Sequence, residues 1–158
     1  MSEGSAQGGE EMKKIGDYTC RGQMTTENEW NRITLFDGRF DTAYRLVYFE
    51  IAPYDTKTAG NDVVAKVATD DSALADGGLW NWDDNREIAW ASSENRVSFG
   101  PSFRPSTIDK DNLIVEDVYV SYGHVTTDSP VNYILVFEKY DISEWRGALA
   151  MVRNRSQS

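Results

Sequence analysis

The sequence predicts an all-β domain, an antiparallel β-sandwich of jelly-roll-like type that ends in a short C-terminal helix. About seven or eight short segments alternate apolar and polar residues, and turn residues separate them at intervals typical of sandwiches. The chain shows no βαβ rhythm and no internal repeat. Aromatic residues make up 12% of it, with eight Tyr and five Trp, which favours sheet surfaces over a helical bundle.

The 158 residues suit one folded domain with a single core. Residues 1–13 are rich in Ser, Gly and Glu, so they predict a flexible N-terminal arm that cannot bury enough apolar surface to order itself. Residues 14–158 then form the sandwich domain, with the helix near residues 142–154.

The first half of the chain supplies four predicted strands, at residues 15–25, 31–36, 44–51 and 62–69. Gly22 marks a predicted bulge in the first, and Asp37 and Gly38 predict a turn after the second. The third, Tyr44–Ile51, is apolar on both faces, which predicts a place near the middle of a sheet. Pro53 ends it because proline cannot donate to a ladder.

The second half begins with a predicted long surface loop over residues 70–85, which carries a Gly pair and acidic clusters. Two strands follow at residues 86–91 and 95–99, joined at Ser92–Glu94, and residues 100–106 read as irregular. Residues 113–122 predict a strand with a bulge at Glu116 and Asp117. Residues 131–140 are apolar on both faces and predict a central strand.

The last segment has helical spacing. Trp145, Ala148, Leu149 and Val152 stand at i, i+3, i+4 and i+7, and Ser143 occupies the N-cap position. Such an apolar stripe either covers the end of its own sandwich or contacts another subunit. The interface candidates in this segment are therefore Trp145, Leu149 and Val152.

Composition excludes several classes of protein. The formal net charge of −10 argues against nucleic-acid binding, which needs clustered Lys and Arg. No run of 18 or more apolar residues predicts a membrane span, and the N-terminal residues lack the apolar centre of a signal peptide. The lone Cys20 offers neither an intramolecular disulfide nor a metal site.

The sequence predicts no enzyme, no catalytic residue and no cofactor. The sole histidine, His124, has Asp128 and Ser129 nearby but no nucleophile elbow, and phosphate-binding glycine motifs are absent. Acidic clusters at Asp83–Asn85 and Asp109–Asp111 do not follow the EF-hand pattern. We therefore expect solvated acidic loops and no metal ligands, with a structural Ca²⁺ as the alternative.

Trp80 and Trp82 are candidate binding residues in the predicted loop. At i and i+2 they face the same way in an extended segment, and Asn81, Asp83 and Asp84 beside them can hydrogen-bond sugar hydroxyls. This pattern fits a lectin-like platform. The same rings equally serve to bury contacts in the core or in an interface.

Leu35–Arg45 alternates aromatic residues with Asp and Arg, which predicts ion pairs that fix a turn between two strands. At an oligomer contact the same residue types act as specific contact residues. Arg39 and Tyr44 are therefore the interface candidates of this segment.

Three stretches together resemble small virion structural proteins of tailed phages from aquatic environments. They are LFDGRFDTAYR (Leu35–Arg45), WNWDDNREIAW (Trp80–Trp90) and the C-terminal YILVFEKYDISEWRGALAMVRNRSQS (Tyr133–Ser158). The resemblance implies a non-enzymatic β-domain present in many symmetric copies on a particle. It covers capsid decoration or cement proteins and tail components alike.

The function expected from these observations is that of a virion structural protein, a capsid decoration or cement protein that bridges neighbouring capsid subunits. Its expected partners are the major capsid protein or other virion proteins, together with further copies of itself, and neither nucleic acid nor membrane. Its expected location is the virion, assembled in the host cytoplasm. The alternative is a carbohydrate-binding module or a tail component for host attachment.

Overall fold

The computed structural model describes residues 12–35, 38, 41–96, 100–103, 106–124 and 130–143, with the backbone alone at 96 and 100–103. Within these ranges the fold is all-β, without a helix. The strands are β1 (Lys13–Met24), β2 (Asn31–Thr34), β3 (Thr42–Pro53), β4 (Val63–Ala68), β5 (Glu87–Arg96), β6 (Gly100–Phe103), β7 (Thr107–Ile108), β8 (Asp117–His124) and β9 (Val131–Asp141).

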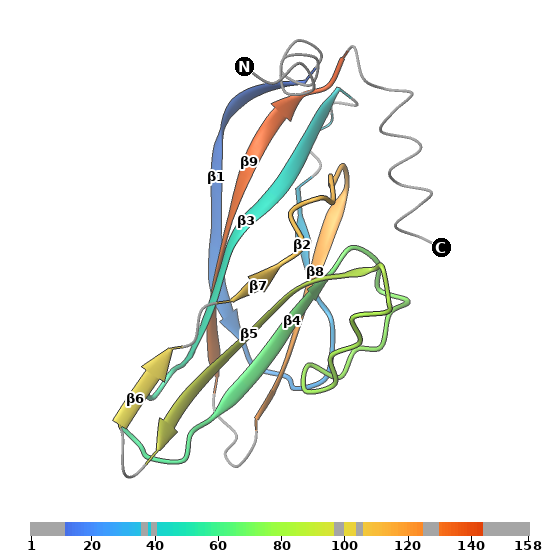
Figure 1. Ribbon diagram of the computed structural model, residues 1–158. Coiled ribbons are helices and arrows are strands. Elements are labelled where there is room, and N and C mark those ends of the chain that lie inside the picture. The colour runs from blue at the N-terminus through green and yellow to red at the C-terminus, as the bar shows by residue number, and fades with distance from the viewer. Residues whose placement is uncertain are drawn as a thin grey trace.

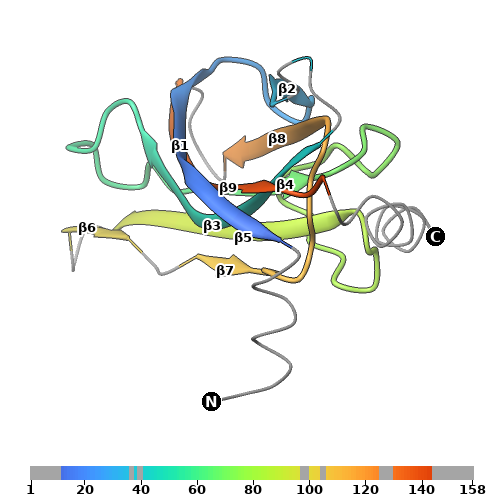
Figure 2. The same cartoon turned by 90° about the horizontal axis from the view of Figure 1, so that it is seen from above.

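Two antiparallel sheets face each other, as Figure 1 and the view from above in Figure 2 show. One sheet has the strand order β1-β9-β3, and the other has the order β2-β8-β4-β5-β6, with β7 paired to β5. This arrangement confirms the predicted all-β antiparallel sandwich. Lys13, expected in the arm, already belongs to β1. The predicted helix near residues 142–154 lies outside the described residues except for its first two positions.

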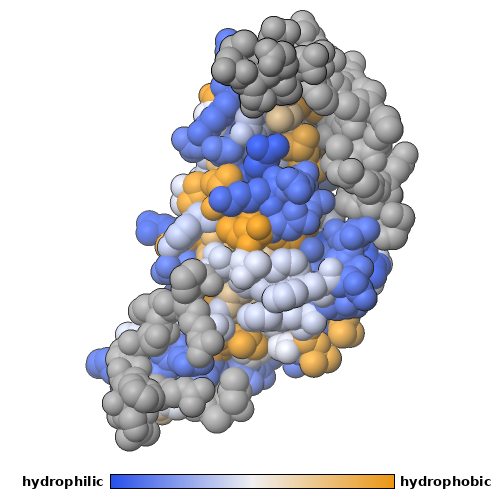
Figure 3. Space-filling model, viewed as in Figure 1, coloured by the Kyte–Doolittle hydropathy of each residue, from blue (hydrophilic) through white to orange (hydrophobic). Residues whose placement is uncertain are grey.

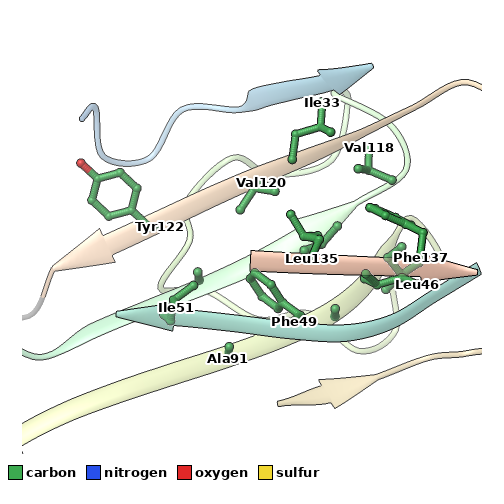
Figure 4. Packing of buried hydrophobic residues seen from close by; sticks show 14 of the residues in the cluster. Ile33, Leu46, Phe49, Ile51, Ala91, Val118, Val120, Tyr122, Leu135 and Phe137 are labelled. Atoms are coloured by element: carbon green, nitrogen blue, oxygen red, sulfur yellow. The ribbon is translucent and has the colours of Figure 1, made fainter. Parts of the chain in front are cut away.

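The core lies between the two sheets, where alternate residues of each strand point inward (Figure 4). Phe49 of β3, Leu135 and Phe137 of β9 and Tyr122 of β8 are all 1% exposed or less. Burying each such side chain contributes about 1.5–3 kcal/mol. Sequence alternation predicts this inward set because one face of each strand must be apolar.

The central position predicted for residues 131–140 is confirmed, since β9 lies between β1 and β3. The central position predicted for Tyr44–Ile51 is wrong, because among the described strands β3 is at the edge of its sheet. Its apolar run has another cause. A register shift between Leu46 and Tyr48 directs Leu46 and Phe49 to the same core, although the two are three residues apart.

The turn predicted at Ser92–Glu94 is also wrong. β5 runs without a break from Glu87 to Arg96, and its return partner is β6, within the stretch expected to be irregular. Polar residues of β5 are buried here with hydrogen-bond partners. The Asn95 amide nitrogen donates to the carbonyls of Thr56 and Thr58, each at 2.9 Å.

Two predicted bulges are misplaced. β1 shifts register between Lys14 and Gly16, whereas Gly22 pairs regularly with Tyr133. A Cβ on Gly22 would lie 2.8 Å from the Tyr133 hydroxyl, so the missing side chain makes room for that ring. In the segment 113–122, Ile114 bridges to Tyr44 of β3, and β8 starts only at Asp117. That segment therefore touches both sheets in turn.

A second, smaller apolar cluster lies on the other face of the three-stranded sheet. Ala43, Tyr140 and Ile142 are buried there, with Met12, Leu113 and Val115 packed against them. Ala43 and Tyr44 are neighbours in β3 and therefore point to opposite faces. The sheet consequently has apolar contacts on both faces at the end where β3 begins.

Candidate functional site

The segment between β4 and β5, residues 69–86, carries four of the eight large apolar side chains that are exposed among the described residues, and we call it the tryptophan loop. It lies against the six-stranded sheet on the side away from the core (Figure 1, green). A Cβ on Gly77 would be 2.4 Å from the Tyr122 Cα, so the loop backbone rests directly on β8. The Ser121 hydroxyl donates to the Ala75 carbonyl. The loop is therefore packed on the sheet.

A buried ion pair lies beneath this loop. Lys66 of β4 and Glu87 of β5 are 0% and 1% exposed, and the Lys66 Nζ lies 2.8 Å from a Glu87 carboxylate oxygen. The same Nζ donates to the Leu79 carbonyl at 2.7 Å and lies 5.8 Å from the centre of the Trp30 ring. Lys66 thereby holds the loop at Leu79 while its charge is compensated.

The second carboxylate oxygen of Glu87 accepts two further hydrogen bonds. The Asn81 backbone N–H donates at 2.9 Å and the Trp90 indole N–H at 3.0 Å. The pair therefore fixes the loop on both sides of Trp80. Charge-assisted bonds of this kind are stronger than neutral ones, and in a buried site they define the geometry closely.

A second network closes the base of the loop. Asp84 accepts from the Arg86 Nε at 2.8 Å and Nη2 at 2.7 Å, and the Arg86 Nη1 donates to the Ser72 hydroxyl at 2.9 Å. Asp70 accepts from the Ser72 backbone N–H at 2.8 Å. The hydrogen bonds from Arg86 lower the pKa of Asp84, and those from Ser72 lower the pKa of Asp70.

The fixed loop presents apolar side chains to solvent. Leu74, Leu79, Trp80 and Trp82 are 57%, 55%, 40% and 68% exposed. Trp82 packs on Trp90, with ring centres 5.7 Å apart, and the Trp80 indole N–H donates to the Gly77 carbonyl at 3.1 Å. Figure 3 shows apolar surface beside strongly hydrophilic surface in the region where Figure 1 draws this loop. A rigid aromatic surface set among acids is suited to binding.

No family model, curated protein or solved structure matches this chain.

Of the interface residues predicted from sequence, the structure brings Trp80 and Trp82 together on the tryptophan loop. Tyr44 is a correction, because it is a core residue that is 5% exposed and packs edge-on against Phe137 at 6.2 Å. Its ring therefore contributes to the core of its own sandwich. The remaining predicted interface residues, Arg39, Trp145, Leu149 and Val152, lie outside the described residues.

Sequence reasoning missed Lys66 and Glu87. A signal for Lys66 was present, since a lysine inside the apolar run Val63–Ala68 is a charged residue in a strand that is otherwise buried. Nothing local identifies Glu87 as its partner, because the pairing comes from the β4–β5 register.

Carboxylates of the acidic clusters accept hydrogen bonds from neighbouring residues. Asp109 accepts from the Asp111 backbone N–H at 3.1 Å and from the Asn112 amide at 2.9 Å. Among the residues that the structure describes, no group of three or more His, Cys, Asp or Glu side chains is placed to hold a metal ion. The described part of the chain likewise has no helix long and apolar enough to cross a bilayer.

His124 ends β8, where its ring packs edge-on against Tyr122 at 5.5 Å and its backbone N–H donates to Glu27. Asp128 and Ser129, its neighbours in sequence, lie outside the described residues. The described contacts of His124 therefore join the end of β8 to the Tyr122 ring and to Glu27.

Proposed function

We propose that this chain is a non-catalytic docking protein of a virus particle, which binds a neighbouring shell protein through the tryptophan loop. The observation that carries the proposal is the exposure of Trp82 on a loop that Lys66 and Glu87 hold from below. Tryptophan is among the residues that dominate binding energy at protein interfaces. A loop already fixed in the free protein loses little conformational entropy when it binds.

The charge of the loop indicates the chemistry of the partner. The segment 69–86 carries five aspartates and a single arginine. Asp70, Asp76 and Asp84 accept hydrogen bonds from within the loop, whereas Asp71 and Asp83 are exposed and accept none from the described residues. Two available carboxylates beside exposed aromatic rings fit a basic protein surface with an apolar pocket.

The identity of the partner comes from the resemblance to phage virion proteins. We place the chain on the assembled particle as a decoration or cement protein, with the major capsid protein or another virion protein as its partner. Many copies on a symmetric shell make even a modest contact effective, because each copy is held by more than one neighbour. If the chain is located on the tail instead of the capsid, the same docking surface would bind a tail protein.

Carbohydrate binding through Trp82 is the second candidate. An exposed, fixed aromatic ring is the observation in its favour. The flanking polar groups favour docking on protein instead, because Asn81 accepts from the Asp83 backbone N–H and both Asp84 oxygens accept from Arg86. These groups are then less available to sugar hydroxyls.

The docking proposal is tested on particles. Mass spectrometry of purified virions should detect the chain, and its absence would contradict the virion assignment. Particles depleted of the chain are then incubated with purified variants and sedimented. Trp82→Ala should weaken co-sedimentation by about 2 kcal/mol, or roughly 30-fold.

Tyr54→Ala is the matched control, because Tyr54 is 66% exposed on a different loop, close to the 68% of Trp82. This variant should co-sediment like the unaltered chain. Equal loss in both variants would argue against a specific role for the tryptophan loop. Binding on a glycan array that disappears in Trp82→Ala would favour the second candidate.

A further inference from the structure

The strand β1 offers a second surface, separate from the tryptophan loop. It is an edge strand of the three-stranded sheet, and within the described residues it pairs only with β9 (Figure 1, Figure 2). Its residues from Lys13 to Gln23 are exposed or half-buried. An edge strand of this length presents a row of backbone donors and acceptors to another strand.

Proteins usually protect such an edge, and β1 is protected at one end. Two lysines, Lys13 and Lys14, and a register shift before Gly16 interrupt its beginning. From Gly16 to Met24 the ladder with β9 runs regularly, without a bulge or a proline. The regular part of β1 therefore keeps an uninterrupted ladder geometry on which a further strand can pair.

The side chains on the outward face of β1 carry both signs of charge, so they can pair with the same side chains of a second copy. Asp17, Thr19 and Arg21 alternate with residues that face the core, so they lie on the same face of the sheet. Within the described residues, Asp17 has only the exposed Lys14 as an ion-pair partner, with 44% and 63% of the Lys14 and Asp17 side chains exposed. Arg21 makes no hydrogen bond or ion pair within the described part of the chain.

A two-fold axis fixes which residues meet when β1 pairs with β1 of a second copy. The axis lies midway between the two strands, at the level of one residue that faces its own copy, and residues equally far on either side of that residue then face each other. With Thr19 at the level of the axis, Asp17 of each copy lies opposite Arg21 of the other, so two opposite-charge pairs form. An axis at Asp17 or at Arg21 would instead place like charges opposite each other.

Apolar surface supports the same register. Tyr18 is 43% exposed although it points to the core side, because nothing described covers that edge. In the Thr19-centred pairing Tyr18 lies opposite Cys20 of the second copy, and Gly16 opposite Gly22. The contact thus buries an exposed ring, and the glycines of the Gly16–Gly22 pairs add no side chain of their own to the approach.

We propose that two copies of this chain associate through β1 in antiparallel pairing centred on Thr19, with Asp17 and Arg21 forming reciprocal ion pairs. The contact joins the two three-stranded sheets into one continuous sheet across the dimer. It leaves the tryptophan loop of each copy for a different partner, so this inference does not depend on the docking function.

The test is charge reversal followed by mixing of the full-length variants. Sedimentation velocity over a concentration series should show a dimer for the unaltered chain. Asp17→Arg and Arg21→Asp should each weaken dimerisation by about tenfold or more, because two repulsive pairs replace two attractive ones. An equimolar mixture of these variants should form a heterodimer, seen by native mass spectrometry.

The mixture also controls for folding, since a variant that is not folded cannot rescue its partner. Lys57→Asp and Asp111→Arg reverse exposed charges far from β1 in sequence, and both should dimerise normally. An unaltered chain that stays monomeric at every concentration would overturn the proposal. So would reversed variants that dimerise as before, or a mixture that remains monomeric.

Discussion

The Lys66 ammonium lies 2.8 Å from the Glu87 carboxylate, and neither side chain reaches solvent. This pair sits between the outer face of the six-stranded sheet and the tryptophan loop, and every further partner of its charged groups belongs to that loop or to an aromatic ring beside it. The pair therefore connects the stability of the sandwich with the position of the exposed tryptophans.

Lys66→Met should destabilise the protein by about 3–5 kcal/mol, because it leaves the Glu87 carboxylate buried without its counter-charge. Urea unfolding followed by tryptophan fluorescence measures the change. Lys57→Met is the control, since Lys57 is exposed and its change should stay within about 0.5 kcal/mol. Loss below about 1 kcal/mol for Lys66→Met would show that the pair carries little of the stability.

Adding Glu87→Gln to Lys66→Met should restore part of the lost stability. Glutamine keeps an oxygen that accepts from Asn81 and Trp90 but carries no charge, so no uncompensated ion remains buried. The double variant should be at least about 1 kcal/mol more stable than the sum of the single changes predicts. Additive losses would contradict direct coupling between the two residues.

Gly77→Ala tests whether the tryptophan loop must rest on β8. The new Cβ would lie 2.4 Å from the Tyr122 Cα, where backbone cannot give way, so we expect about 2 kcal/mol of destabilisation or more. Gly78→Ala is the matched control. Its nearest atoms are the Asp76 carboxylate at 3.4 Å and the Val64 methyl at 3.6 Å, both tolerable contacts.

Thermal or urea unfolding of both glycine variants gives the comparison. Gly78→Ala should be neutral or slightly stabilising, since alanine reduces the freedom of the unfolded chain. Equal stability of the two variants would mean that the loop lifts from β8 at little cost.

Acid should loosen the base of the tryptophan loop. The folded-state pKa of Asp84 is lowered by its hydrogen bonds to Arg86. Its contribution to stability is therefore fully present above the unfolded pKa, about 3.9, and is lost as the pH falls through the folded value. The free energy of unfolding should decline more steeply below about pH 4 in the unaltered chain than in Asp84→Asn.

Urea midpoints measured at several acidic pH values test this difference. Asp71→Asn removes a neighbouring exposed carboxylate that accepts no hydrogen bond from the described residues, and it should leave the slope unchanged. Identical slopes for the unaltered chain and Asp84→Asn would refute the assignment to Asp84.

Alternation of apolar and polar residues predicted most strands and the inward-facing core, because burial of one face is decided by neighbours in sequence. The turn predicted at Ser92–Glu94 is wrong because burial of polar residues depends on contacts with distant segments. Polar residues there resemble a turn, yet Ser93 is 3% exposed and Asn95 4%, and the Asn95 backbone N–H donates to the Asp62 side chain from another segment. Only tertiary contacts make those polar positions compatible with a strand.

In the candidate site, too, some residues could be recognised from the local sequence and others only from tertiary contacts. Trp80 and Trp82 stood out locally, as two large aromatic rings in a loop with acidic neighbours. Lys66 and Glu87, which hold that loop, are 21 residues apart and meet through strand register, so spacing alone gave no reason to pair them. The burial of Tyr44 could not be read locally, because its ring packs against Phe137 of β9, a residue far along the chain.

The thiol of Cys20 should react slowly in the folded protein. Burial raises its pKa above the ordinary value, and a hydrogen bond from the Tyr133 hydroxyl offsets this only in part. Because the thiolate is the reactive form, alkylation near pH 8 should run several-fold slower than for a free cysteine and should reach the free rate in urea.

The Asp17→Arg variant separates this effect from dimerisation. If slow alkylation comes from the environment within one chain, it persists in that variant. A rate equal to that of free cysteine in the folded Asp17→Arg protein would instead assign the protection to the second copy.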